Sequence, residues 1–311
     1  MNWHNVRWDD AALDGLADGE PDDGCLPDFL IIGAAKSGTT SLYYYLRQHP
    51  DIGMSVPKEP NFFHRADFRD ALDEYRRCFT AAGRVRGESS VEYTYHPFVK
   101  GVPERIHSVL PNARLIYVVR DPIDRAEALH HQHYCSHKVG REVEKTFAEL
   151  DPGKNLYVAS SMYALQLKQY LQFFARSSIL IVDQEALRFK REDTLRSVFA
   201  FLGVEADFAS DRFDSELNTR DTKLRMTGAG VRLRRSPVAD LVRTKVPASV
   251  REAAFEVARR GLMRPAPRTL LPADVRARLA DALRDDVAQF RELSGLAFDH
   301  WSVGPAERVR S

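Results

Sequence analysis

Residues 27–46, PDFLIIGAAKSGTTSLYYYL, constrain this chain most, because they pass from an apolar strand through a glycine-bounded turn into a helix. Residues 29–32 suit a buried strand, and residues 39–47 can continue as a helix. Gly33 and Gly38 permit backbone torsions that side chains forbid. Free N–H groups then converge at the helix start, where the helix dipole also favours negative charge. The segment therefore predicts an anion site.

The side chains of this turn indicate which anion it suits. One ammonium and four hydroxyls come from Lys36, Ser37, Thr39, Thr40 and Ser41. These donors suit a phosphate or sulfate ester better than a carboxylate. The nucleotide-triphosphate loop G-x-x-x-x-G-K-[ST] places its lysine directly after the second glycine, whereas Lys36 precedes Gly38 by two positions. A strand-to-helix turn that is merely rich in glycine, serine and threonine is the alternative.

Strand and helix patterns alternate along most of the chain. Strands are predicted at 52–54, 85–90, 113–120 and 179–182, and helices at 67–79, 96–110, 122–134, 156–174, 193–202 and 273–293. Alternation predicts an α/β fold with a central parallel sheet flanked by helices, whose ligands bind at the carboxyl ends of the strands. Arg120 lies at such an end. We expect a mobile lead-in at 1–26, one domain at 27–301 with a basic loop at about 214–236, and a tail at 302–311.

Composition excludes several partner classes. The 311 residues carry a formal net charge of +1, which gives no global attraction to nucleic acid or to an anionic membrane. No apolar run could span a bilayer, and the acidic N-terminal stretch lacks a signal-peptide core. Three separated cysteines fit neither a disulfide framework nor a zinc motif. We therefore expect a cytoplasmic protein with free thiols, no nucleic-acid partner and no transmembrane segment; the oligomeric state is open.

The loop order G-A-A-K-S-G-T-T-S-L resembles the 5'-phosphosulfate loop of sulfotransferases that use 3'-phosphoadenosine 5'-phosphosulfate (PAPS). The likeness is to the carbohydrate and heparan-sulfate type and its bacterial relatives, and it spans about residues 27–301. It implies a P-loop NTPase-like sulfotransferase fold, PAPS as donor, adenosine 3',5'-bisphosphate (PAP) as product, and no metal. It also implies that Lys36 offsets the charge that develops on the leaving phosphate.

The octapeptide VPKEPNFF at 56–63 resembles the Lys-Glu-Pro-x-Phe-Phe pattern of this family. The resemblance gives Glu59 the role of general base for the acceptor. A base must lie within hydrogen-bond reach of the proton that it removes. The neighbouring Lys58 could keep Glu59 ionised or contact the sulfate. An exposed Lys-Glu pair in a loop is the alternative interpretation.

A third match, LIYVVRDPIDRAEALHHQHY at 115–134, resembles the 3'-phosphate element of the family. There an arginine ending the strand and a serine eight residues later hold the phosphate. Arg120 fits the pattern, but Ala128 replaces the serine. One lost hydrogen bond to a charged group costs about 1.5 to 3 kcal/mol, which weakens a site of many contacts without abolishing it. His131 or Lys223 could compensate; a salt bridge between Arg120 and a nearby aspartate is the alternative role.

The remaining candidates concern the cofactor arm and the acceptor cleft. The basic stretch NTRDTKLRMTGAGVRLRR places Lys223 and Arg225 in an arm over the ligand site. RGESSVEYTYHP at 86–97 resembles the family's Gly-Glu-x-Ser-Pro-x-Tyr, with Val91 in place of proline. Expected acceptor-cleft residues are Lys58, Glu88, Ser90, Tyr93, His131 and His133. A metal site at the histidines 130 to 137 is disfavoured, because no second carboxylate cluster completes it.

These residues predict a PAPS-dependent sulfotransferase. Its acceptor would be a hydroxyl, less readily an amine, of a carbohydrate or of a glycosylated or other small-molecule metabolite. A P-loop nucleotide kinase or NTPase is the second hypothesis, but its lysine and magnesium ligands are not evident. A non-catalytic nucleotide-binding relative is the third, supported by Ala128 alone.

Overall fold

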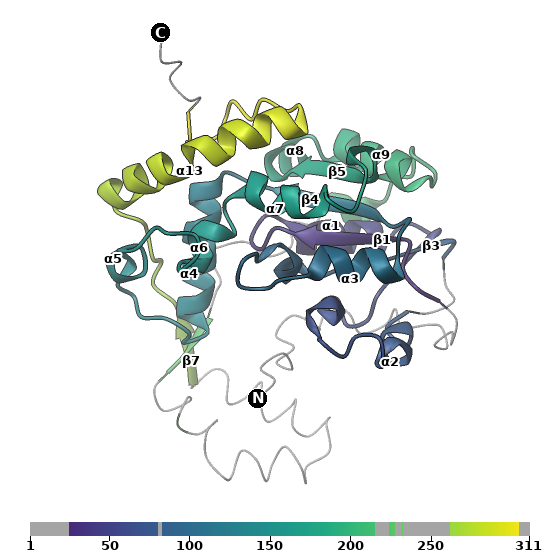
Figure 1. Ribbon diagram of the computed structural model, residues 1–311, viewed down its shortest axis with the longest axis horizontal. Helices are drawn as coiled ribbons and strands as arrows, with labels where there is room; N and C mark the ends of the chain where they lie inside the picture. Colours follow the sequence, from purple (N-terminus) through teal and green to yellow (C-terminus); the bar gives the residue numbers. More distant parts are fainter. Residues whose placement is uncertain (1–24, 80–82, 215–223, 228–231, 233–261, 305–311) are drawn as a thin grey trace.

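The computed structural model describes residues 25–79, 83–214, 224–227, 232 and 262–304 (Figure 1). The strands are β1 (Phe29–Gly33), β2 (Ile52–Met54), β3 (Val85–Ser89), β4 (Arg114–Val119), β5 (Ile179–Asp183), β6 (Leu224–Met226) and β7 (Met263–Pro265). The α-helices are α1 (Thr39–Leu46), α2 (Leu72–Arg76), α3 (Val102–Val109), α4 (Pro122–Cys135), α5 (Val143–Thr146), α6 (Leu156–Ala159), α7 (Tyr163–Tyr170), α8 (Gln184–Phe189), α9 (Arg191–Leu202) and α13 (Ala273–Ser294). Four short 3₁₀ turns complete the description: η2 (Phe62–His64), η3 (Val91–Thr94), η4 (Arg176–Ser178) and η5 (Asp211–Asp214).

The main sheet has five strands in the order β2-β3-β1-β4-β5. All four pairings are parallel, with Leu30 opposite Glu88 on one side and opposite Leu115 on the other. β1 lies at the centre, and its two neighbours come later in the chain. The predicted α/β fold with a central parallel sheet is confirmed.

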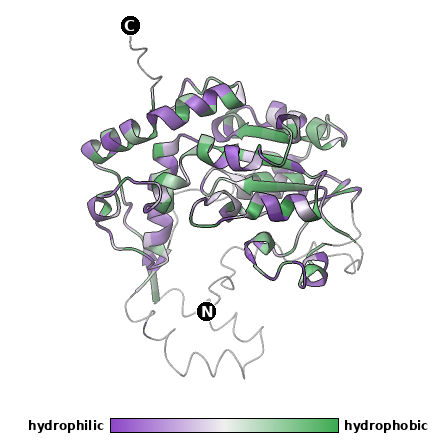
Figure 2. Ribbon diagram, in the orientation of Figure 1, coloured by the Kyte–Doolittle hydropathy of each residue, from purple (hydrophilic) through white to green (hydrophobic). Residues whose placement is uncertain are grey.

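Helices cover both faces of this sheet. Leu30 and Leu115 belong to a buried cluster that includes side chains of α3, α7 and α13. Ile31 and Ile116 belong to a second cluster with side chains of α1 and α9. In Figure 2 the central strands are green, whereas the helices mix green and purple, as expected for strands buried on both faces beneath amphipathic helices.

Three predicted helices differ from the structure, and one of them, predicted at 96–110, is limited to α3. The pattern at 156–174 predicts one helix, but the structure divides it into α6 and α7, because Met162 has a non-helical ψ of 84°. Beside this break the Ser161 hydroxyl accepts a hydrogen bond from Arg125 Nε at 3.0 Å. Ser161 also donates to the carbonyl oxygens of Pro122 and Tyr157 at 3.0 and 2.9 Å. The helix predicted at 67–79 is limited to α2. Periodicity reports neither the torsion at Met162 nor the contacts of Ser161 with residues distant in the sequence.

Only parts of the two chain ends and of the basic loop lie among the described residues. The predicted C-terminal helix is α13, which runs along the top of Figure 1 beside α4 and α7. Most of the lead-in, the basic loop and the tail lies outside the described residues, as does Lys223. The cysteines, Cys25, Cys78 and Cys135, form no disulfide. None of the helices in the described part of the chain is long and apolar enough to cross a membrane.

Asp286 on α13 stabilises the start of α7 across the helix interface. Its carboxylate accepts hydrogen bonds from the N–H groups of Ala164 at 3.0 Å and Leu165 at 2.8 Å, and the side chain is buried. Asp286→Ala should lower the free energy of unfolding by about 2 kcal/mol, because two helix N–H groups lose a charged acceptor. Denaturant unfolding measures this. The exposed neighbour Asp285→Ala is the control, and equal losses in both variants would contradict the assignment.

Candidate functional site

The carboxyl ends of the five parallel strands meet at one edge of the sheet. β1 leads there into the glycine-bounded loop, β2 into the segment that carries Glu59, and β4 into Arg120. β1 is flanked by β3 and β4, so the chain crosses to opposite sides of the central strand, which is where open α/β sheets bind ligands. The three motifs found in the sequence therefore converge at one edge.

Backbone torsions shape the loop that follows β1. Gly33 and Gly38 have φ values of 152° and 93°, and Lys36 adopts the left-handed conformation with φ of 68°. A Cβ on Gly33 would lie 2.2 Å from the Thr94 hydroxyl oxygen, so η3 packs directly against the glycine. A non-glycine residue in the left-handed region carries a cost that the surroundings must offset, and such residues concentrate at functional sites.

Hydrogen-bond donors collect where this loop enters α1. The Leu42 N–H bonds to the Gly38 carbonyl, so the N–H groups of the first helical residues have no acceptor within the helix. Those residues are Thr39, Thr40 and Ser41. No acidic side chain occupies the first turn, and the buried Ser37 hydroxyl has no hydrogen-bond partner among the described residues. This set of donors fits a phosphate or sulfate ester.

The Lys36 ammonium faces α4. Its Nζ lies 3.4 Å from Oε1 of Gln132, within hydrogen-bond distance. Gln132 stands one helical turn after Ala128, on the same side of α4. Sequence reasoning did not select Gln132; the signal available to it was the four-residue spacing from Ala128, the position where the family's serine is missing.

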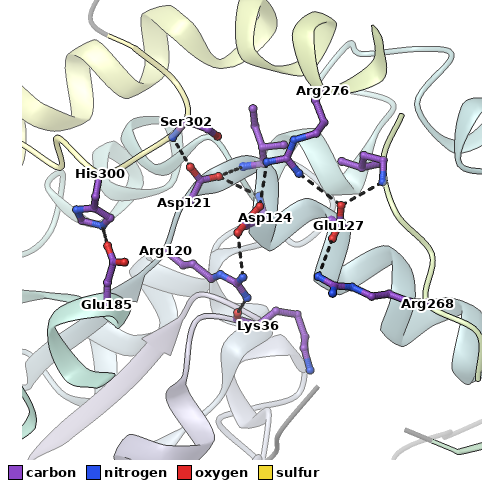
Figure 3. Close-up of polar contacts among 12 residues, drawn as sticks. Lys36, Arg120, Asp121, Asp124, Glu127, Glu185, Arg268, Arg276, His300 and Ser302 are labelled. Atoms are coloured by element: carbon purple, nitrogen blue, oxygen red, sulfur yellow. Dashed lines mark hydrogen bonds and ion pairs between the residues drawn. The ribbon is translucent and has the colours of Figure 1, made fainter. Parts of the chain in front are cut away.

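Arg120 lies between the anion loop and α4 (Figure 3). Its guanidinium donates to the Lys36 carbonyl oxygen at 3.5 Å and to Asp124 at 3.2 Å. Tyr163 holds the backbone of Arg120 by donating to its carbonyl at 2.8 Å. Arg276 bonds the other oxygen of Asp124 at 3.0 Å. Although burial opposes ionisation, these two arginines lower the pKa of Asp124 below its ordinary value.

Arg120 therefore forms a salt bridge with Asp124 and also lies beside the anion loop. Arg120 is mostly buried, with 13% of its side chain exposed. A second cation, Arg276, shares the charge of Asp124, so this carboxylate does not neutralise Arg120 by itself. The guanidinium can therefore serve both as a structural contact and as an anion ligand.

Glu59 lies in the segment that follows β2. Its Oε1 is 2.7 Å from the Lys58 ammonium, and 39% of its side chain is exposed. Lys58 also lies 5.9 Å from the centre of the Tyr43 ring, on α1. The carboxylate is thus ion-paired with Lys58 and solvent-accessible, and accessibility is what a proton acceptor for an external substrate requires.

The expected acceptor-cleft residues divide into different environments. Glu88, Ser90 and Tyr93 are buried and bond to one another rather than forming an exposed cleft wall. His131 contacts Thr269. His133 lies 2.7 Å from the Tyr157 hydroxyl, and burial, with the charge of nearby lysines, lowers its pKa to about 4.

His133 lies within electrostatic range of the anion loop, since the charge of Lys36 is among the causes that lower its pKa. Arg225, expected in the cofactor arm, donates from Nε to the Tyr134 carbonyl at 3.1 Å and covers the Tyr134 ring at 4.2 Å. Arg225 therefore packs on the last turn of α4. Its expected companion, Lys223, is not among the described residues.

The match of the chain to a protein-family model shows which family carries this site. The model of the sulfotransferase domain matches residues 26–224, which include the anion loop, Glu59 and Arg120. The chain belongs to the sulfotransferase domain family. It is therefore a sulfotransferase-type enzyme, and the family uses PAPS as its sulfuryl donor.

Curated relatives of the sulfotransferase are large animal enzymes. It is 29% identical over 196 residues to the bifunctional heparan sulfate N-deacetylase/N-sulfotransferase 4 of Mus musculus. It is 30% identical over 196 residues to the corresponding enzyme 3 of Homo sapiens. Each match covers 58% of this chain and 22% of the relative, so the chain spans about a fifth of their length.

A solved structure shares the fold of the sulfotransferase over most of its length. The sulfotransferase from Alicyclobacillus acidocaldarius aligns with a TM-score of 0.64 and 24% sequence identity. The alignment covers 89% of this chain and 99% of that one. This likeness supports the arrangement of sheet and helices described above.

One cluster of metal-ligand side chains occurs among the described residues of the sulfotransferase. Asp183, Glu185 and His300 lie together near the carboxyl end of β5. His300 Nε2 is 3.0 Å from Glu185 and 3.4 Å from Asp183, and Figure 3 shows His300 directed at Glu185. Asp183 also accepts from the Glu185 N–H at 3.3 Å. Ion pairing and helix capping account for this cluster.

Proposed function

We propose that this enzyme transfers the sulfuryl group of PAPS to a hydroxyl, less readily an amine, of a carbohydrate or of another small-molecule metabolite. The observation that carries the proposal is the left-handed Lys36 inside the loop bounded by Gly33 and Gly38. Arg120, which follows β4, and Glu59, in the segment that follows β2, support it, because both strands end at the same edge of the sheet. This combination supplies anion binding and a proton acceptor at one edge of the sheet.

The donor would be held by two groups of residues. The 5' end would lie on the free N–H groups, the Lys36 ammonium and the hydroxyls at the start of α1. The 3'-phosphate would lie against Arg120, whose guanidinium already contacts the loop. PAPS supplies the activated sulfuryl group.

The chain's own residues would carry the proton and the charge. Glu59 takes the proton from the acceptor as the new bond to sulfur forms on the opposite side from the breaking sulfur–oxygen bond. Lys36 stabilises the negative charge left on the phosphate, as preorganised donors do in other group transfers. Positioning supplies much of the remaining rate.

The acceptor class is the least constrained part of the proposal. The animal relatives are named as heparan sulfate N-sulfotransferases, which favours a carbohydrate acceptor. Acceptor choice depends on loops that vary within one fold. A panel of N-deacetylated heparosan, other glycans, glycolipids and small hydroxylated metabolites, incubated with labelled PAPS, would identify the class; product on a hydroxyl or on an amine separates O- from N-sulfation.

Calorimetric titration tests the donor. PAP should bind, whereas ATP with magnesium should not, because no lysine follows Gly38. Preference for ATP would overturn the proposal in favour of a nucleotide kinase or NTPase. PAP binding without transfer to any member of the panel would favour the non-catalytic relative.

Ala128→Ser should tighten PAP binding by about tenfold or more, because a hydroxyl donor to a charged phosphate is restored. Ala128 is partly exposed on α4, one turn after Asp124, so a serine fits without overpacking. Calorimetric titration of both proteins with PAP checks this. Unchanged or weaker affinity would show that another group, such as Gln132 one turn further along α4, already fills the place.

A further inference from the structure

A buried polar network lies at the end of β3, behind the segment that carries Glu59. The Glu88 carboxylate is fully buried. Its Oε1 accepts hydrogen bonds from the hydroxyls of Tyr75 and Tyr93, each at 2.9 Å, and its Oε2 accepts from Ser90 at 2.9 Å. No arginine or lysine pairs with Glu88 among the ion pairs of the described residues.

Two of these three hydroxyls also bind the backbone next to Glu59. The Ser90 oxygen accepts the Asn61 N–H at 3.0 Å, and the Tyr93 oxygen accepts the Phe63 N–H at 3.2 Å. Asn61 then returns a hydrogen bond from its side-chain amide to the Glu59 carbonyl at 3.3 Å. A continuous chain of hydrogen bonds thus joins Glu88 to the segment 59–63.

The charge of Glu88 determines the direction of these bonds. An ionised carboxylate only accepts, so each hydroxyl must give its single proton to Glu88. The oxygen atoms of Ser90 and Tyr93 are then left as acceptors for the two backbone N–H groups. Burial raises the pKa of Glu88 to about 7, against the three hydroxyl hydrogen bonds that favour the carboxylate, and the charge of Glu59 adds to the rise.

We infer that Glu88 is a positioning residue for the sulfuryl-transfer reaction: through Ser90 and Tyr93 it holds the backbone that places Glu59. The inference rests on the proposed function of Glu59. It replaces the expected role of Glu88, Ser90 and Tyr93 as acceptor-binding residues. Small displacements of a catalytic group lower the rate strongly, so a network that fixes this backbone acts on turnover without touching the donor.

The network contains its own control. Ser90→Ala and Tyr93→Phe each remove one acceptor for the backbone next to Glu59, whereas Tyr75→Phe removes a hydroxyl whose hydrogen bond, within the described part of the chain, is to Glu88. At about pH 8 Glu88 is ionised in the native protein. We expect the first two variants to lower kcat by about tenfold, with an unchanged Kd for PAP, and Tyr75→Phe to stay within about twofold of the native enzyme.

Two measurements decide the inference. Turnover is followed as sulfate transfer from PAPS to N-deacetylated heparosan, or to the best acceptor of the panel, and hydrogen exchange is followed at the Asn61 and Phe63 amides. Faster exchange at these amides in Ser90→Ala and Tyr93→Phe, but not in Tyr75→Phe, supports the network even if no acceptor is found. Equal exchange in all three variants, or equal kcat, overturns it. Loss of PAP binding by the native protein would instead reject the proposed function.

Discussion

Lys36→Ala should reduce sulfate transfer by about a hundredfold to a thousandfold, the usual effect of removing one donor that stabilises developing charge. The ammonium leaves the loop that follows β1, while Gly33, Gly38 and the start of α1 keep their geometry. PAP binding should weaken less, by about tenfold, because the helix N–H groups and Arg120 still bind phosphate. Initial rates with labelled PAPS and calorimetry with PAP measure the two effects.

A control for this experiment is Lys168→Ala, which removes an exposed lysine of α7 whose Nζ bonds Gln289. It should leave turnover and PAP affinity unchanged. Lys36→Gly adds a thermodynamic test, since glycine adopts a φ of 68° without the cost borne by lysine. It should be as inactive as Lys36→Ala but more stable by about 1 kcal/mol. Near-native turnover of either Lys36 variant would contradict the role given to the ammonium.

The strands were predictable because a parallel sheet covered on both faces requires nearly continuous apolar runs. The ends of β1, β4 and β5 each lie within one residue of the predicted bounds. The anion loop between β1 and α1 was predictable from its two glycines. The helix bounds were less predictable. The division between α6 and α7 lies at Met162, beside a bond between Ser161 and Arg125, which are distant in sequence.

In the candidate site, too, some features follow from local sequence spacing and others depend on residues distant in the sequence. His131 and His133 are two positions apart, and side chains with that spacing point to different sides of a helix. The structure accordingly places His131 against Thr269 and His133 against Tyr157. This difference could have been predicted from α4 alone, and it argues against one cleft containing both histidines.

The polar motif at the end of β3 was harder to interpret. Glu88 and Ser90 are residue types usually found at the surface, and the resemblance of their motif to the family implies that they line the acceptor cleft. β3 lies between β2 and β1, however, and both side chains are fully buried. Their partners Tyr75, Tyr93 and Asn61 come from segments whose spatial neighbours the sequence does not reveal.

Glu59→Gln should lower kcat by about a hundredfold or more, because the amide cannot accept the acceptor's proton. The Kd for PAP should not change, since the contacts of Glu59 are with Lys58 and with Asn61, not with the anion loop. The isosteric change leaves the fold intact, because 39% of the side chain is exposed. Initial rates at saturating PAPS, with calorimetry for PAP, provide the measurement.

The matched control is Glu92→Gln, on the neighbouring turn η3, where the carboxylate pairs with His64 at 3.6 Å. Because Glu92 has no role in the proposed reaction, its variant should keep native turnover. Raising the pH should not restore Glu59→Gln, whereas an acceptor that already ionises in solution should react at a rate closer to native, since no base is then required. If Glu59→Gln transfers sulfate to a neutral hydroxyl at the native rate, the proton is taken by another group and Glu59 is not the base.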